Sequence, residues 1–263
     1  MISNPENISS TTLNDRKKKY SFHYEHAPIN EALIDIQVTV PERVTPEVLN
    51  SKYSLISDEY PKHDIIHLQQ LGFHNQDGQK TTVTMDHGIA GYRYSSEDQC
   101  NVVQFRTDGF TFSRLKPYDC WESMKNDAMK LWGIYSKAVS PETITRIGTR
   151  YINILKLPIG ADISEYLSAP PKVPENLPQK LGNFLTRIYI RDPLSEETHG
   201  FLTQALEKAQ PDHAPIVLDI DVFVAKQFES TDDSIWQQLD ELRYFKNMVF
   251  KESIKEKTEE LFK

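Results

Sequence analysis

The sequence contains few of the residues that build small, chemically specialised sites. Only two of its 263 residues are cysteines, Cys100 and Cys120, and their spacing fits neither a zinc knuckle nor a redox pair. No run approaches the ~18 apolar residues of a membrane helix, and the first twenty residues lack the apolar segment of a secretory signal. These absences argue against a disulfide-stapled domain and a membrane span, so we expect a cytoplasmic protein without membrane contact.

The chain also has fewer basic residues than acidic ones. Lys and Arg number 30 against 38 Asp and Glu, which leaves a formal net charge of −8 at pH 7. A broad basic footprint for duplex nucleic acid is therefore not expected, and only a local basic patch stays open. The chain also lacks a glycine-rich phosphate loop, a nucleophile elbow and a zinc-ligand cluster, so no linear motif specifies a reaction.

The chain divides into a polar tail and a folded body. Residues 1–22 carry few large apolar side chains and include the basic run Arg16 to Lys19, so we expect a disordered tail. The body separates into an N-terminal α+β half, 23–140, and a C-terminal α+β half, 141–263, packed on the first.

Periodicity in the N-terminal half predicts a strand, a helix, several strands and a long helix. Apolar and polar residues alternate from Leu33 to Val40, as in a strand with one wet face. A helix is expected from Thr45 to Tyr60. The turn signals His87-Gly88 and Asp108-Gly109 then separate short β-like runs that predict an antiparallel meander. From Trp121 to Ala138 apolar residues recur every three or four positions, which is typical of a helix on a sheet.

The C-terminal half repeats this order. Arg146 to Leu157 is apolar on both faces, as expected for a central strand, and Ile216 to Ala225 alternates. Phe184 to Arg191 is a further strand, whereas Thr198 to Ala209 fits a strand or a helix. A helix from about Asp233 to Phe262 closes the chain. We therefore expect an α+β fold of antiparallel sheets covered by two long helices, with two tandem copies of a strand-helix-strands-helix unit as one interpretation.

Several blocks of the sequence resemble a known family. They are HAPINEALIDIQV at 26–38, DGFTFSRLKPYDCWESMKNDAMKLWGIY at 108–135 and TRIGTRYINILKLP at 145–158. These blocks are similar to the GFTFSRLKPY-like and RIGTRYIN-like signatures of a sporadically distributed bacterial family of uncharacterised proteins. The run LDELRYFKNMVFKESI at 239–254 is similar to that family's closing helix. The resemblance implies a bacterial, intracellular protein and assigns no reaction.

Arginines within the expected strands form a candidate anion-binding face. Guanidinium groups bind phosphate or carboxylate through two parallel hydrogen bonds, and tyrosine offers a stacking surface. Residues four apart along a strand share a face, so Arg146 and Arg150 lie on one face of their strand, and Arg187 and Arg191 lie on one face of theirs. The candidates are Arg114, Arg146, Arg150, Arg187 and Arg191. The alternative is that they pair with the chain's own acids, such as Glu31, Asp35, Asp219 and Asp221.

Two aspartates form a second candidate site. Asp219 and Asp221 lie two residues apart on one strand face, with Cα atoms about 7 Å apart. Two-metal phosphoryl-transfer sites use carboxylates at such a spacing to hold Mg²⁺. The alternative is that both aspartates simply lie on the solvent-exposed face of an amphipathic strand.

We favour a non-enzymatic binding or adaptor module with a protein partner and no cofactor or metal. The first alternative is a Mg²⁺-dependent phosphoryl-transfer or nucleotide-binding enzyme that uses Asp219 and Asp221. The second alternative is a protein that binds single-stranded nucleic acid on its arginine and tyrosine face, although the net charge of −8 does not favour it. The sequence does not specify an oligomeric state.

Overall fold

A computed structural model of the chain describes residues 12–76, 79–179, 181–230 and 233–262, and within them the chain forms one antiparallel sheet of ten strands. The strands are β1 (Ile29–Thr39), β2 (Lys62–Gln76), β3 (Gln79–Ser95), β4 (Asn101–Arg106), β5 (Gly109–Leu115), β6 (Thr143–Leu157), β7 (Phe184–Asp192), β8 (Ser195–Leu206), β9 (Ala214–Val224) and β10 (Phe228–Glu229). Nine of them follow the order β2-β3-β4-β5-β1-β6-β9-β8-β7, and β10 pairs with β6.

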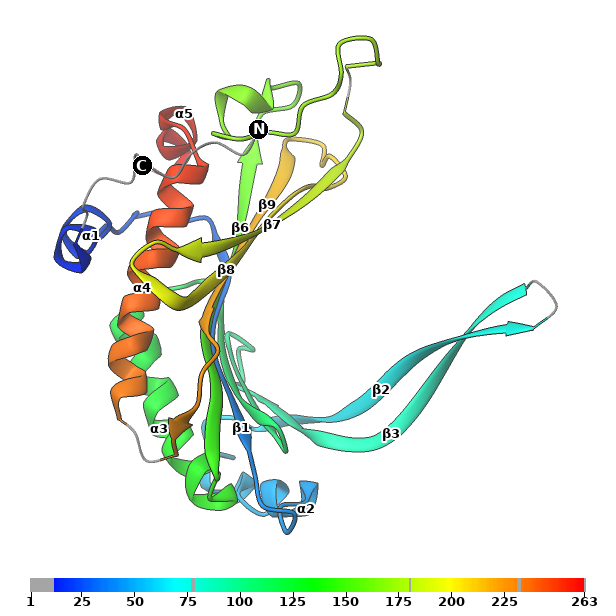
Figure 1. Cartoon of the computed structure of the whole chain (residues 1–263), viewed down its shortest axis with the longest axis vertical. Coiled ribbons are helices and arrows are strands. Elements are labelled where there is room, and N and C mark those ends of the chain that lie inside the picture. The colour runs from blue at the N-terminus through cyan, green and yellow to red at the C-terminus, as the bar shows by residue number, and fades with distance from the viewer. Residues whose placement is uncertain (1–11, 77–78, 180, 231–232, 263) are drawn as a thin grey trace.

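Five α-helices and three short 3-10 segments complete the described part of the chain. The helices are α1 (Leu13–Lys19), α2 (Pro46–Asn50), α3 (Trp121–Val139), α4 (Ser234–Ser253) and α5 (Glu256–Glu259), and the 3-10 segments are η1 (Tyr53–Leu55), η2 (Ile163–Glu165) and η3 (Glu260–Phe262). Both α3 and α4 lie on one face of the sheet, and the β2–β3 hairpin projects far from the body on the other side (Figure 1). Among the described helices, none has the length and apolarity needed to span a membrane.

The central strand β1 shows how the sequence builds the core. Its even-numbered residues Ile34 and Ile36 are fully buried beneath the helices, while Asp35 between them points to the opposite face. The helices supply the matching apolar side chains, among them Met124 and Leu131 of α3 and Leu239, Leu242 and Phe245 of α4. Each such buried side chain contributes roughly 1.5–3 kcal/mol to folding. The opposite face, which we call the open face, carries no helix comparable to α3 or α4 (Figure 1).

The expected fold class is wrong in two respects. The described residues form one continuous sheet rather than separate sheets, and the helices are short, the longest being α4 with 20 residues. The helix expected from Asp233 to Phe262 ends at Ser253. Ile254 leaves the helix in extended backbone (φ −116°, ψ 160°), is buried, and forms a bridge to Leu167, after which α5 begins. Helical periodicity continues through this break, so the sequence does not reveal it.

The two halves of the chain contribute to the same sheet in a similar order. In the first, β2 to β5 form a meander whose last strand returns to pair with β1, and α3 follows. In the second, β7 to β9 form a meander whose last strand returns to pair with β6, and α4 comes after β10. The seam between the halves is the antiparallel pair β1–β6. Duplication of one ancestral unit stays a prediction.

The β2–β3 hairpin differs from the short runs that the sequence predicts. β3 continues for 17 residues through His87-Gly88 instead of turning there. Gly88 has φ +94°, and the register of β2 against β3 shifts nearby at His67. A glycine with positive φ is typical of a β-bulge, which adds a residue and lets the strand go on. The predicted hairpin at Asp108-Gly109, by contrast, is confirmed, because β4 and β5 pair directly around it.

The segment before β1 also differs from the disordered tail expected over residues 1–22. Residues 1–11 lie outside the described residues, but Leu13–Lys19 forms helix α1. A capping box made by Thr12 and Asp15 stabilises the N-terminus of this helix. Arg16 is buried and makes two parallel hydrogen bonds to Asp192 at the end of β7, with Nη2···Oδ1 at 2.6 Å. The basic run therefore contributes one residue to the interior.

We expect this buried ion pair to be sensitive to the loss of one partner. Arg16→Met leaves the Asp192 carboxylate buried and uncompensated, which should lower the free energy of unfolding by about 3 kcal/mol. The double variant Arg16→Met with Asp192→Leu removes both charges and should cost less than the single variant. Urea unfolding of both proteins measures this, and a double variant that is less stable than Arg16→Met would contradict it.

Candidate functional site

The open face gathers charged and aromatic side chains in rows across the sheet. In one row the register brings Asp35, Gly148, Phe223, His199 and Arg191 opposite one another on consecutive strands. The neighbouring rows contain Arg150, Asp221, Phe201 and Tyr189, and then Ile152, Asp219, Thr203 and Arg187. Four of the five candidate arginines therefore belong to this surface or its margin: Arg146 and Arg150 on β6, and Arg187 and Arg191 on β7.

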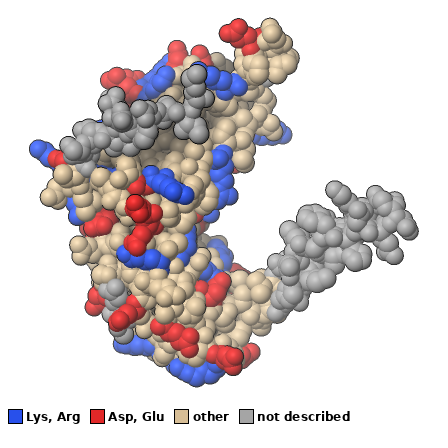
Figure 2. Space-filling model, viewed as in Figure 1, with Lys and Arg blue, Asp and Glu red and all other residues tan. Residues whose placement is uncertain are grey.

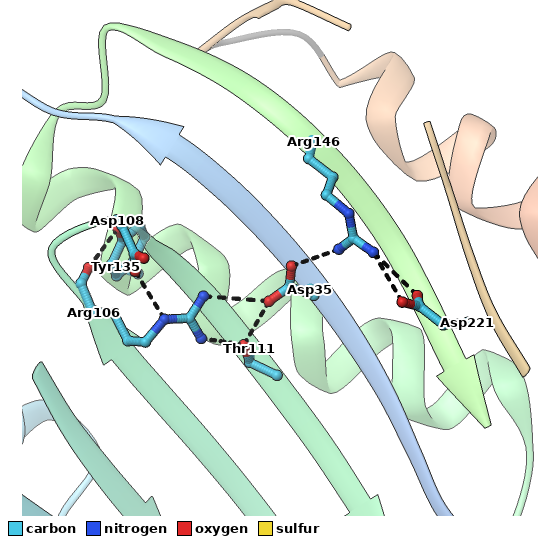
Figure 3. Close-up of polar contacts among 7 residues, drawn as sticks. All are labelled: Asp35, Arg106, Asp108, Thr111, Tyr135, Arg146 and Asp221. Atoms are coloured by element: carbon cyan, nitrogen blue, oxygen red, sulfur yellow. Dashed lines mark hydrogen bonds and ion pairs between the residues drawn. The ribbon is translucent and has the colours of Figure 1, made fainter. Parts of the chain in front are cut away.

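Asp35 is the centre of a polar network on this face (Figure 3). Its carboxylate accepts hydrogen bonds from Thr111 Oγ1 at 2.8 Å, from Arg106 Nη2 at 3.3 Å and from Arg146 Nη1 at 2.9 Å. Arg146 also donates to both carboxylate oxygens of Asp221, at 3.1 and 3.3 Å. A Cβ at Gly148 would lie 3.1 Å from Arg146 Nη1, so the absence of a side chain there leaves room for this guanidinium.

Arg150 is satisfied in the same way. Its Nε and Nη2 donate to the two oxygens of Asp219 at 2.8 and 2.6 Å, and this hydrogen bonding raises the pKa of Arg150. Burial raises the pKa of Asp221 above its usual value, against the opposing effects of Arg146 and Arg150. The oxygens of Asp219 and Asp221 are thus engaged by guanidinium groups. Among the residues that the structure describes, no three His, Cys, Asp or Glu gather as metal ligands.

Arg114 lies apart from the other candidates. It contacts Asp119, Ser123 and Asp127 at the start of α3, on the helix-covered face of the sheet. Burial lowers the pKa of Arg114, but the two carboxylates outweigh that effect and raise it overall. The structure therefore does not bring Arg114 together with the four arginines of β6 and β7, and its interactions are internal.

Arg187 and Arg191 differ from the other three. Both are exposed on β7, and neither has an ion-pair partner in the described part of the chain. The Arg187 guanidinium stacks over the Phe201 ring, with Cζ 4.1 Å from its centroid. These two side chains keep their hydrogen-bonding capacity for an external group.

An aromatic cluster, which we define as Tyr189, His199, Phe201 and Phe223, lies beside these arginines. Tyr189 stacks on His199 with centroids 5.6 Å apart, and Phe201 stacks on Phe223 at 6.0 Å. Arg146 covers Phe223 at 4.4 Å, so the cluster runs from the polar network to the sheet edge. Sequence reasoning missed His199 and Phe201, because their segment fitted both a strand and a helix. Alternation of His199, Phe201, Thr203 and Ala205 on one face was the available signal.

Strand β7 is one of the two edge strands of the sheet within the described residues, and β2 is the other. The outer backbone of β7 therefore presents unpaired N–H and C=O groups, which can pair with another strand. The side chains along it are unusually exposed for apolar residues, with Leu185 72% and Tyr189 47% accessible. In the space-filling view, acidic and basic side chains are interspersed without a broad area of one sign on the side shown (Figure 2).

No family model matches the chain, and no curated protein matches it. The resemblance to the bacterial family stays a prediction.

The network around Asp35 should be more important for stability than the ion pair of Arg150. Asp35→Ala leaves Arg106 and Arg146 without a shared acceptor in a mostly buried setting, and we expect a loss of about 3 kcal/mol. The Arg150 side chain is 43% exposed and that of Asp219 14%, so water partly screens this pair and Arg150→Ala should cost less, about 1–2 kcal/mol. Urea unfolding of the two variants provides the comparison. Equal losses in the free energy of unfolding would contradict the central role of Asp35 in this network.

Proposed function

We propose that the chain is a non-enzymatic binding module that takes an extended, acidic segment of a partner protein along the edge strand β7. The observation that carries this proposal is the combination of a free strand edge with Arg187 and Arg191, which have no ion-pair partner among the described residues. The proposal keeps the cytoplasmic location and the two related halves that the sequence leads us to expect.

An edge strand can bind an extended peptide, which pairs with it as an additional strand of the sheet. Main-chain hydrogen bonds provide affinity, and alternate side chains of the peptide provide specificity. Arg187 and Arg191 lie four residues apart, about 13 Å along the strand. An added strand has the same spacing, so it would meet them with acidic side chains at positions i and i+4. The residue between, at i+2, would meet Tyr189, which favours an apolar or aromatic side chain.

The same surface fits the other two functions less well. A single-stranded nucleic acid would bring many phosphates close to Asp219 and Asp221, next to the aromatic cluster, in a chain of net charge −8. A Mg²⁺-dependent phosphoryl-transfer site would need these two carboxylates, whose oxygens already accept hydrogen bonds from Arg150 and Arg146. An acidic peptide needs only the two unpaired arginines.

Selection from a random peptide display library tests this function. The wild-type protein should enrich sequences with Asp or Glu at i and i+4 and an apolar residue at i+2. The double variant Arg187→Glu with Arg191→Glu should lose that motif and bind a selected peptide at least about tenfold more weakly, because two charge-assisted contacts become repulsive. Fluorescence anisotropy with the labelled peptide measures the change.

Arg43→Glu is the matched control, since Arg43 is exposed on the segment between β1 and α2, far along the chain from β7. It should leave the affinity within about twofold. Enrichment of the same acidic motif by the double variant would overturn the proposal. Binding of oligo(dT) with a steep loss of affinity in salt would instead favour the nucleic-acid alternative.

A further inference from the structure

A cavity of about 460 Å³ lies between α4, the first turn of α3, strand β6 and the segment that leads into β1. Both halves of the chain contribute to its walls, and it lies on the helix-covered side of the sheet. Sites for small molecules commonly have volumes of about 300–1,000 Å³. The cavity is therefore large enough for an organic ligand.

Lys246 of α4 projects into this cavity from a buried position. The residue is 8% exposed, and its Nζ lies 3.6 Å from the centroid of the Tyr151 ring. Among the residues that the structure describes, it has no hydrogen-bond or ion-pair partner. Burial, together with the positive charge of nearby Arg243, lowers the pKa of Lys246 to about 7.

The other charged groups around the cavity are already paired. Asp119 accepts a hydrogen bond from Arg114, and Glu122 accepts one from Arg243 at 2.8 Å. Protonated Lys246 is therefore the charged group of the described lining that has no direct ion-pair partner. A single monovalent anion would pair with it.

Other buried cations in this fold are paired with acids. Arg16 binds Asp192, and Arg114 binds Asp119 and Asp127. A buried ammonium without an anion is costly, whereas a paired and hydrogen-bonded one is tolerated. The isolation of Lys246 within the chain therefore points to a partner from outside the chain.

The remaining walls are suited to an apolar body. Phe22, Tyr24 and Phe250 line the cavity and contact one another, with centroids 5.1 Å apart for the first two and 6.1 Å for the last two. Tyr118 and Tyr151 are hydrogen-bonded to each other at 3.0 Å between their hydroxyl oxygens. This aromatic part of the wall favours an apolar ligand body by contact and shape, beside the polar part that contains Lys246.

We propose that this cavity binds a monocarboxylate with an aromatic or otherwise apolar body, whose carboxylate pairs with Lys246. This site is separate from the open face and does not depend on the function proposed for β7. The carboxylate would accept hydrogen bonds from the ammonium, and the body would lie against the aromatic walls.

Pairing with Lys246 makes the affinity depend on pH in a defined way. Above pH 7 the amine of the free protein is mostly neutral, so binding of a carboxylate takes up a proton and the affinity falls up to about tenfold per pH unit. Below about pH 6 the amine is already charged, and the affinity levels off. Tyr118, whose pKa burial raises to about 12, and Tyr151, whose pKa burial raises well above its usual value, stay neutral throughout. Tyr24, whose pKa burial raises to about 12, also stays neutral, and the remaining titratable or charged groups of the lining are His23, Cys120, Asp119, Glu122 and Arg243.

The probes are 4-phenylbutyrate, decanoate and their uncharged amides, measured by isothermal titration calorimetry. The wild-type protein should bind at least one carboxylate about tenfold more tightly at pH 7 than the matching amide. It should take up a proton on binding at pH 8, which titrations in two buffers of different ionisation heat reveal. The same pH dependence in the His23→Gln and Cys120→Ser variants would assign the proton to Lys246.

Lys246→Met should abolish both the preference for the carboxylate and the proton uptake, while keeping the apolar contacts. Lys257→Met is the control, because Lys257 pairs with Glu165 and neither residue lines the cavity. Absence of binding by both carboxylates, equal binding of carboxylate and amide, or an affinity that does not change between pH 7 and pH 9 would overturn the proposal. The buffer comparison needs only the wild-type protein, so the test does not rest on folding of the variant.

Stability provides a second measurement of the same lysine. Between pH 7 and 10 the unfolded chain holds the proton of Lys246 more tightly than the folded chain does. The melting temperature of the wild-type protein relative to Lys246→Met should therefore rise with pH in that window, and it should level off below about pH 6. A difference that is independent of pH would show that Lys246 is not in the environment described here.

Discussion

The two sides of the seam strands β1 and β6 face different surroundings, and most other features depend on this difference. Side chains alternate along a strand, so Ile34 and Ile36 enter the core while Asp35 cannot follow them. On β6, Tyr151 lies on the helix-covered side and Arg150 on the open side. A shift of one residue in the register would exchange the two sets and bury the charges. The ion-pair network and the core therefore specify the same register.

Alternation explains why much of the sheet could be predicted. Leu33 to Val40 and Ile216 to Ala225 carry strong period-two patterns, and both segments are strands with the expected faces. Features that depend on distant contacts could not be found in this way. The end of α4 at Ser253 depends on Leu167, which pairs with Ile254 from far along the chain. The helix at Leu13–Lys19 combines a local capping box with a distant contact, the pair of Arg16 and Asp192. Local composition alone favours a disordered tail there.

The candidate site could be predicted only in part from the sequence, for a related reason. Residue type identified the arginines and the acids that could pair with them, and strand period showed which of them share a face, but it did not assign the pairs Arg146–Asp221 and Arg150–Asp219. It could not show that Arg114 points to α3 instead, because that depends on which face the helix covers. Nor could it separate the paired arginines of β6 from Arg187 and Arg191. That distinction depends on strand order, which makes β9 the neighbour of β6 and leaves β7 at an edge.

Lys246 shows a different limit of sequence reasoning. It lies four residues after Leu242 and seven after Leu239, on the apolar stripe of α4, so its burial could have been noticed. A lysine in such a stripe usually extends its ammonium to water along the surface. Here the first turn of α3 and the segment before β1 cover it, and the acids that reach the cavity are held by arginines. The buried arginines Arg16 and Arg114 are paired with acids and Lys246 has no such partner among the described residues, and a local conflict of this kind is typical of a binding site. The cavity lies against the β1–β6 seam, where both halves of the chain supply its walls, so a bound anion would remove that conflict and add contacts between the halves.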